Sequence, residues 1–284
     1  MKYIHFFFLF IGMSFGLFAK KDTVSIGNAF LKKLINLSIK GKGGYREECI
    51  NMKMKNLGKD SILLFVEAGR RLYSQDSSMQ DILIVKDMYI PLASNQERIV
   101  SAYGFCCQAH KSAPAKDAVF SVGEIASKEL MELARYINKA KLGAGSIQQA
   151  VWVVSDNNEI SSVVDDGTEA VANLRKFLSA QKNIEMPWYN TFYKKNAQQL
   201  FSGKPEKITG KINYSIFNDL TMVAANIRDE NGTIVKSFLI NKTAMRGDYT
   251  FDFSWDVSKM PLGNYTIRLT ANQAELKKLA IKLK

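Results

Sequence analysis

Histidine and cysteine are scarce in this sequence, and their scarcity limits the chemistry that it can perform. The 284 residues include two histidines, His5 and His110, and three cysteines. His5 lies in an N-terminal apolar segment that we expect to be removed, which leaves His110 alone. One histidine cannot build a multi-histidine metal site, and no cysteines and histidines have zinc-finger spacing. We therefore predict a protein that is not an enzyme and that uses no metal and no cofactor.

Long apolar runs are absent beyond the N-terminus. There, Lys2 precedes an apolar run from Ile4 to Phe18, and Ala19 is followed by the charged residues Lys20-Lys21-Asp22. A basic start, an apolar stretch and a small residue at its end are typical of a secretory signal, here residues 1–19. The run is shorter than the roughly 20 residues of a membrane span, although an uncleaved N-terminal anchor is the alternative. We expect an exported protein with no stable membrane span, at the cell surface or extracellular, with the periplasm also open.

Basic clusters longer than a pair are also absent, although the net charge is +12. No stripe of lysine and arginine alternates with stacking aromatics, so we expect no nucleic-acid binding. A positive charge suits acidic partners such as anionic polysaccharides or lipid headgroups. The expected ligand is an unidentified surface protein or polysaccharide.

The pattern of apolar residues predicts a mainly β protein of two modules, as the length also suggests. Alternating or continuous apolar runs predict strands at 34–39, 49–54, 61–67, 82–85, 88–91 and 98–107. Helical spacing follows, with Ser127, Ser146 and Thr168 as the expected N-caps. Residues 24–185 are thus expected to form a β-sandwich with an appended helical part, and residues 186–203 a linker.

Residues 204–284 contain only strand and turn patterns. The runs alternate at spacings of about 8–12 residues, which is typical of an Ig-like sandwich. Asn231-Gly232 between two such runs predicts a hairpin, because the favoured turn needs positive φ at its central residues.

Three segments of this C-terminal module carry a resemblance to known domains. They are Asp229-Glu230-Asn231-Gly232, Pro261-Leu262-Gly263-Asn264-Tyr265 and Lys277-Lys278-Leu279-Ala280-Ile281-Lys282. Over residues 207–284 the pattern resembles the Ig-like domains of flagellar hook caps and the C-terminal sorting domains of type IX secretion substrates. The resemblance implies a non-catalytic spacer, or a signal that contacts the export machinery. A generic Ig-like sandwich without a sorting role is the alternative.

The N-terminal module carries a second resemblance. Phe105-Cys106-Cys107 ends an expected strand, and Gln148-Gln149-Ala150-Val151-Trp152 opens an expected helix. This arrangement resembles the thioester domains of surface adhesins, although Ile147 stands where their motif has threonine and the cysteine is doubled. The resemblance implies an internal thioester between the side chain of Gln148 and the thiol of Cys106, with Cys107 as the other candidate. Such a bond needs no histidine and no metal.

A disulfide competes for the same thiols. Because adjacent strand residues point to opposite faces, only one of Cys106 and Cys107 can face Cys49. A bridge from Cys49 would close a loop of nearly sixty residues and contribute on the order of 4 kcal/mol. A Cys107–His110 hydrolase pair is a further alternative.

These observations predict an exported surface or extracellular binding or adhesion protein. The first alternative is a structural envelope protein whose cysteines are purely structural. The second is an enzyme of a type that the sequence does not reveal.

Overall fold

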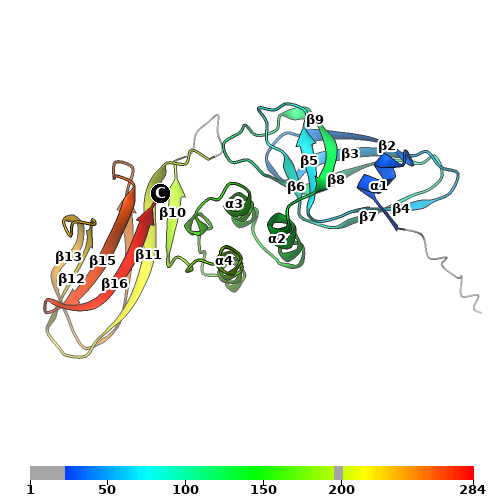
Figure 1. The fold of residues 1–284 in the computed structure, drawn as a ribbon. Helices are drawn as coiled ribbons and strands as arrows, with labels where there is room; N and C mark the ends of the chain where they lie inside the picture. Colours follow the sequence, from blue (N-terminus) through cyan, green and yellow to red (C-terminus); the bar gives the residue numbers. More distant parts are fainter. Residues whose placement is uncertain (1–22, 195–200) are drawn as a thin grey trace, which may run out of the picture.

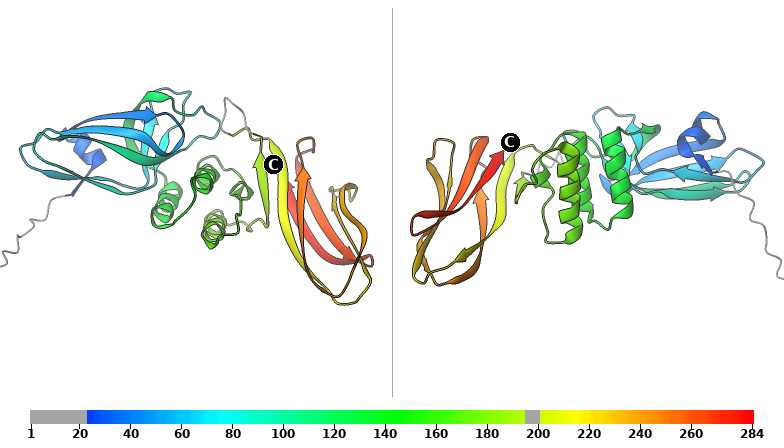
Figure 2. Two further views of the ribbon diagram at one scale, coloured as in Figure 1. Left: turned by 180° about the vertical axis from the view of Figure 1, so that it is seen from behind. Right: turned by 60° about the horizontal axis from the view of Figure 1, so that its bottom comes forward.

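The computed structural model describes residues 23–194 and 201–284, so the predicted signal segment, residues 1–19, lies outside the described residues. The fold is mainly β, as the sequence predicts. Three parts follow one another along the molecule: a β-rich N-terminal part, a group of helices, and a C-terminal pair of sheets (Figure 1). The helices lie between the two β parts in the other views as well (Figure 2).

The N-terminal strands close into a barrel. Its order is β2 (Ile35–Lys42), β3 (Arg46–Asn56), β8 (Glu97–Cys106), β6 (Ile82–Ile84), β5 (Arg70–Ser74) and β9 (Lys116–Ile125). Pairing of β9 with both β2 and β5 closes the ring. The sequence pattern did not predict this closed barrel, because it identified neither β5 nor β9, the two strands that complete the ring.

A small sheet accompanies the barrel, in the order β1 (Thr23–Ser25), β4 (Ile62–Val66) and β7 (Met88–Leu92). The helix α1 (Ile26–Leu31) follows β1 directly, and the side chain of Ser25 accepts a hydrogen bond from the N–H of Asn28. Apolar side chains from both β1–α1 and the barrel share one buried core.

The helical part begins where the sequence predicts and then departs from it. Ser127 caps α2 (Lys128–Lys139) and Thr168 caps α4 (Glu169–Lys182), each by accepting a backbone hydrogen bond. The prediction of Ser146 as a cap is wrong. Helix α3 (Ala144–Ser155) begins after Gly143, whose backbone is extended and whose carbonyl accepts from the N–H of Ile147. Ser146 therefore lies inside the first turn.

A second core, separate from the one inside the barrel, lies between these helices, the 3₁₀ helix η1 (Ile160–Ser162) and side chains of β6 and β8 such as Leu83 and Phe105. Fully buried apolar side chains of α2, α3 and α4 meet there, including Leu133, Val151 and Leu174. Burying each such side chain contributes about 1.5–3 kcal/mol relative to exposing it. The helical part is thus a packed unit and not a loose appendage.

The C-terminal module is a sandwich of two antiparallel sheets around a third core. One sheet has the order β10 (Tyr189–Tyr193), β11 (Pro205–Ile216) and β14 (Gly247–Asp256). The other has the order β13 (Ile234–Ala244), β12 (Thr221–Arg228), β15 (Gly263–Ala271) and β16 (Ala274–Leu283). In the predicted Asn231-Gly232 turn, positive φ occurs at Gly232 (79°) and not at Asn231, because the connection spans Asp229 to Thr233.

Part of the segment expected to be a linker belongs to this sandwich. Strand β10 pairs with β11, and the buried Tyr189 accepts a hydrogen bond from the N–H of Lys282 and donates one to its carbonyl, both at 3.0 Å. Phe192 lies under the ammonium group of Lys207. Residues 195–200 of the expected linker lie outside the described residues. In the described part of the chain, no helix is both long and apolar enough to cross a membrane.

Candidate functional site at Cys106 and Gln148

The end of β8 and the start of α3 meet at Cys106 and Gln148, two residues that lie 42 positions apart. The Gln148 side chain is 2% exposed and Cys106 is fully buried. Nε2 of Gln148 donates to the Cys106 carbonyl at 2.8 Å, and the Cys106 N–H donates to Oε1 of Gln148 at 3.3 Å. The same N–H also lies 3.1 Å from the Tyr45 carbonyl. The structure thus brings together the residues that the sequence pairs, with the carboxamide of Gln148 on the main chain of Cys106.

The thiols of the two neighbouring cysteines enter different cores. Cys106 belongs to the barrel core together with Cys49, whereas Cys107 belongs to the helical core. This separation agrees with the expectation that only one of the pair can face Cys49. All three are free thiols here. A disulfide stays a prediction, and the shared core makes Cys106 its partner for Cys49.

Burial controls the acidity of the three thiols. Loss of hydration raises the pKa of Cys49 and that of Cys107 to about 12, and it raises the pKa of Cys106 well above its ordinary value. The thiol of Cys49 donates to the Gly104 carbonyl at 3.4 Å. Since the thiolate is the nucleophile, none of these groups is activated for reaction with a solute at neutral pH.

We therefore expect the thiols of Cys49 and Cys107 to resist iodoacetamide at neutral pH and to react once the chain unfolds. Stability should also fall in alkali. The pKa of Cys49 and Cys107 is about 12 in the fold against 9.0 for a free thiol, so only the unfolded chain releases these protons between those values. The stabilisation is complete below pH 9.0 and is lost as the pH rises toward about 12. Urea unfolding across this range measures the slope.

Cys107→Ala is the matched variant for that measurement. It removes the thiol proton of Cys107 and leaves the thiol of Cys49 and the other groups that titrate in alkali in place. Its stability should fall less steeply with pH than that of the parent protein. Equal slopes for the two proteins, or rapid alkylation of Cys107 in the native state, would contradict the burial argument.

The alternative pair Cys107 and His110 is not assembled in the described residues. Cys107 is buried among the helices, whereas the side chain of His110 is 75% exposed. Nδ1 of His110 lies 3.3 Å from Oδ1 of Asp156, which also accepts the N–H of Ala109. The geometry gives a surface histidine beside a carboxylate and does not support a thiol nucleophile activated by it.

A polar network beside the site escaped the sequence analysis. Gln80 is fully buried, and its Oε1 accepts from Nε1 of Trp152 at 3.3 Å and from the N–H of Gln108 at 3.0 Å. Gln108 in turn donates to Asp81, which forms an ion pair with Arg71. These glutamines lie in loops without a recognisable pattern, so nothing in the sequence marks them.

Comparison of the sequence with models of protein families and with curated proteins gives no match. Within residues 23–194 and 201–284, no three residues among histidine, cysteine, aspartate and glutamate gather in a group that could hold a metal ion.

Proposed function

We propose that this protein is an exported surface or extracellular binding protein, with Cys106 and Gln148 as its covalent attachment site. The observation that carries the proposal is the contact of the Gln148 carboxamide with the main chain of Cys106 in a buried position. A thioester is an activated acyl group, and exclusion of water is what allows it to survive until a target arrives.

The chemistry needs only these two side chains. Sγ of Cys106 attacks Cδ of Gln148, the Cδ–Nε2 bond breaks, and ammonia leaves with the thiol proton. A primary amine on the target then attacks the same carbon, which forms an amide and returns the thiol to Cys106. Nε2, the leaving nitrogen, already lies at 2.8 Å from the carbonyl oxygen of Cys106.

The C-terminal sandwich serves in this proposal as a spacer or as a sorting signal for the export machinery. Supporting this role, the module is a separate sandwich with its own core, and it lies beyond the helices from the barrel (Figure 1). The lysines of the Lys277-Lys278 pair are exposed on β16, an edge strand of its sheet. The main chain of Ala280 and Lys282 is bonded to Trp188 and Tyr189, so a partner strand could pair with β16 only in the part that contains Lys277-Lys278.

Uptake of a labelled primary amine tests the covalent site. The mature protein should incorporate methylamine at Gln148, found by peptide mass spectrometry, and release one thiol for each amine taken up. Cys106→Ala and Gln148→Ala should abolish uptake, whereas Cys107→Ala, the neighbour in the other core, should retain it. No uptake by folded parent protein, or uptake that survives Cys106→Ala, would remove this site.

One observation favours a structural protein as the second candidate. Both polar atoms of the Gln148 carboxamide are bonded to the main chain of Cys106, which satisfies the end of β8 as a neighbouring strand would. In that case the folded protein takes up no amine, and unfolding exposes either three alkylatable thiols or one thiol and a Cys49–Cys106 bridge.

A further inference from the structure

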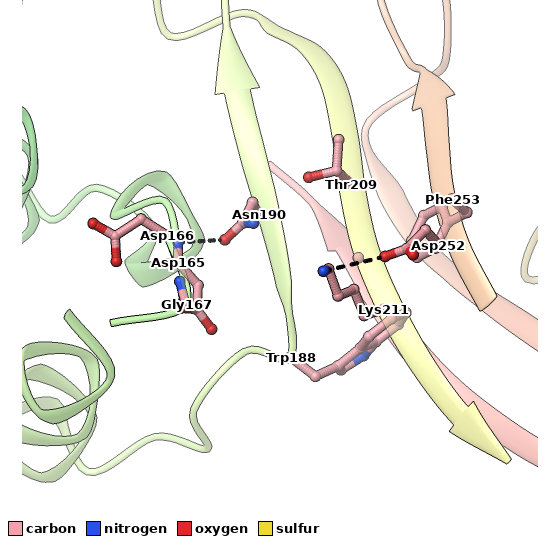
Figure 3. Close-up of a pocket in the computed structure, with 10 residues that line it drawn as sticks. Asp165, Asp166, Gly167, Trp188, Asn190, Thr209, Lys211, Asp252 and Phe253 are labelled. Atoms are coloured by element: carbon pink, nitrogen blue, oxygen red, sulfur yellow. Dashed lines mark hydrogen bonds and ion pairs between the residues drawn. The ribbon is translucent and has the colours of Figure 1, made fainter. Parts of the chain in front are cut away.

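A cleft of about 550 Å³ lies between the helical part and the C-terminal sandwich. One wall is the loop Asp165–Gly167 that precedes α4, and the other is the outer side of β10 and β11 (Figure 3). Sites for small molecules are concave and have volumes of about 300–1,000 Å³. The cleft has the size of such a site, and it is far from Cys106 in the sequence.

The two walls of the cleft are held at a fixed distance. The N–H of Asp165 donates to Oδ1 of Asn190 on β10 at 2.8 Å, and the buried Arg175 donates to the same oxygen at 2.9 Å. Arg175 also bonds the carbonyls of Pro187 and Tyr189. The walls are thus ordered before any ligand arrives, which reduces the entropic cost of binding.

The aromatic residue that lines one end of the cleft is the half-buried Trp188, whereas its neighbour Phe253 is 5% exposed and belongs to the core of the sandwich. The rings of Trp188 and Phe253 lie with their centroids 5.7 Å apart and cover the backbone of Gly210. A Cβ atom at Gly210 would lie 2.7 Å from Cε1 of Phe253 and 2.9 Å from Cζ3 of Trp188, so only glycine leaves room for both rings. Nε1 of Trp188 donates to the Ala280 carbonyl at 2.8 Å, which fixes the indole.

The polar groups of the cleft include both donors and acceptors. Among the described residues, Nδ2 of Asn190 and the hydroxyl of Thr209 have no hydrogen-bond partner, and each carboxylate of Asp165 and Asp166 has one oxygen without a partner. Lys211 lies on the same face, 3.6 Å from Asp252. A ligand that fills this cleft therefore has to donate and to accept hydrogen bonds.

From this combination we infer that the cleft binds a neutral saccharide. Each sugar hydroxyl both donates and accepts hydrogen bonds, and the C–H face of a sugar ring packs against aromatic carbon, for which the cleft offers the exposed part of Trp188. The cleft contains the three carboxylates of Asp165, Asp166 and Asp252 and one ammonium group, that of Lys211, so its net negative charge repels an anionic ligand. An amine would donate only, and it would leave the amide of Asn190 unpaired beside the positive Lys211. The inference names the ligand class for the proposed binding protein, at a site separate from Cys106.

Titration of the purified protein with neutral oligosaccharides tests the inference. The probes are cellohexaose, maltohexaose, mannohexaose, xylohexaose, galactohexaose and chitohexaose at millimolar concentration, followed by calorimetry and by tryptophan fluorescence. Polygalacturonate and spermidine are the anionic and the cationic comparison. At least one neutral probe should bind, and it should bind more tightly than either charged comparison.

Two variants locate the binding. Thr209→Val and Asp165→Asn keep the size of each side chain, and the amide oxygen of the second variant can still accept the N–H of Gly167. Each variant should weaken binding by about tenfold, the loss of one hydrogen bond to a ligand. Thr266→Val, on the outer side of the other sheet, is the matched control and should leave binding unchanged. Cys106→Ala should also bind normally, which separates this site from the covalent one.

No binding by any neutral probe, tighter binding of a charged comparison, or equal affinities of Thr209→Val and Thr266→Val would each overturn the inference. Loss of amine uptake in a protein that still binds the saccharide would overturn only the thioester.

Discussion

Replacing Trp152 with alanine is expected to reduce the free energy of unfolding by about 3–5 kcal/mol. Trp152 is 2% exposed, and although it lies on α3, its side chain packs in the barrel core. Its truncation leaves a large cavity where the two cores meet, and it removes a hydrogen-bond donor from the buried Gln80. Chemical denaturation followed by circular dichroism measures the loss.

Trp152→Phe separates the two contributions. It keeps most of the apolar volume and removes only the indole N–H, so we expect a loss of about 1–2 kcal/mol. Trp152 is the side chain by which α3 enters the barrel core. Equal stability of Trp152→Ala and the parent protein would contradict a role of this contact in holding the helices on the barrel.

Replacing Arg175 with alanine is expected to cost about 3 kcal/mol and to loosen the junction between α4 and β10. The guanidinium is 3% exposed, and it bonds the carbonyls of Pro187 and Tyr189 and the side chain of Asn190. Burial lowers the pKa of Arg175 from its ordinary value, which is far above neutrality, so the group stays charged. Its removal leaves buried carbonyl groups without this donor.

Arg175→Lys keeps the charge but replaces the planar fork with one ammonium group. It should recover only part of the lost stability. Hydrogen exchange of the β10 amides should speed up in Arg175→Ala and stay slow in the strands of the barrel. Uniformly faster exchange over the whole chain, or none at all, would contradict a role of Arg175 at this junction.

Some strands of the fold could be predicted from the sequence, and others could not. Strand β3, which has clear alternation, was predicted within a few residues, because its apolar side chains point into a core at every second position. Strand β5 contains Arg70 and Arg71, and in β9 only Phe120 and Gly123 are buried, which gives no regular apolar alternation. Their pairing is dictated by barrel closure, a tertiary constraint that local patterning does not carry.

The candidate site shows the same limit. A resemblance located Cys106 and Gln148, and the structure places them in contact. The direction of each thiol depends on which core packs on each side of β8. The burial of Gln80 could not be predicted either, because this residue lies in a loop without an apolar pattern. The cleft between the helices and the sandwich was beyond prediction, because the segment that builds it was interpreted as a linker.

The intact mass of the native protein, purified without added amines from the cells that make it, tests the central claim most directly. The account predicts a chain that begins at Lys20 and is lighter than its sequence by one molecule of ammonia. A chain that retains residues 1–19 would contradict export by signal cleavage. A mature chain with the full mass of its sequence, or one short of only two hydrogens, would contradict the thioester at Cys106 and Gln148.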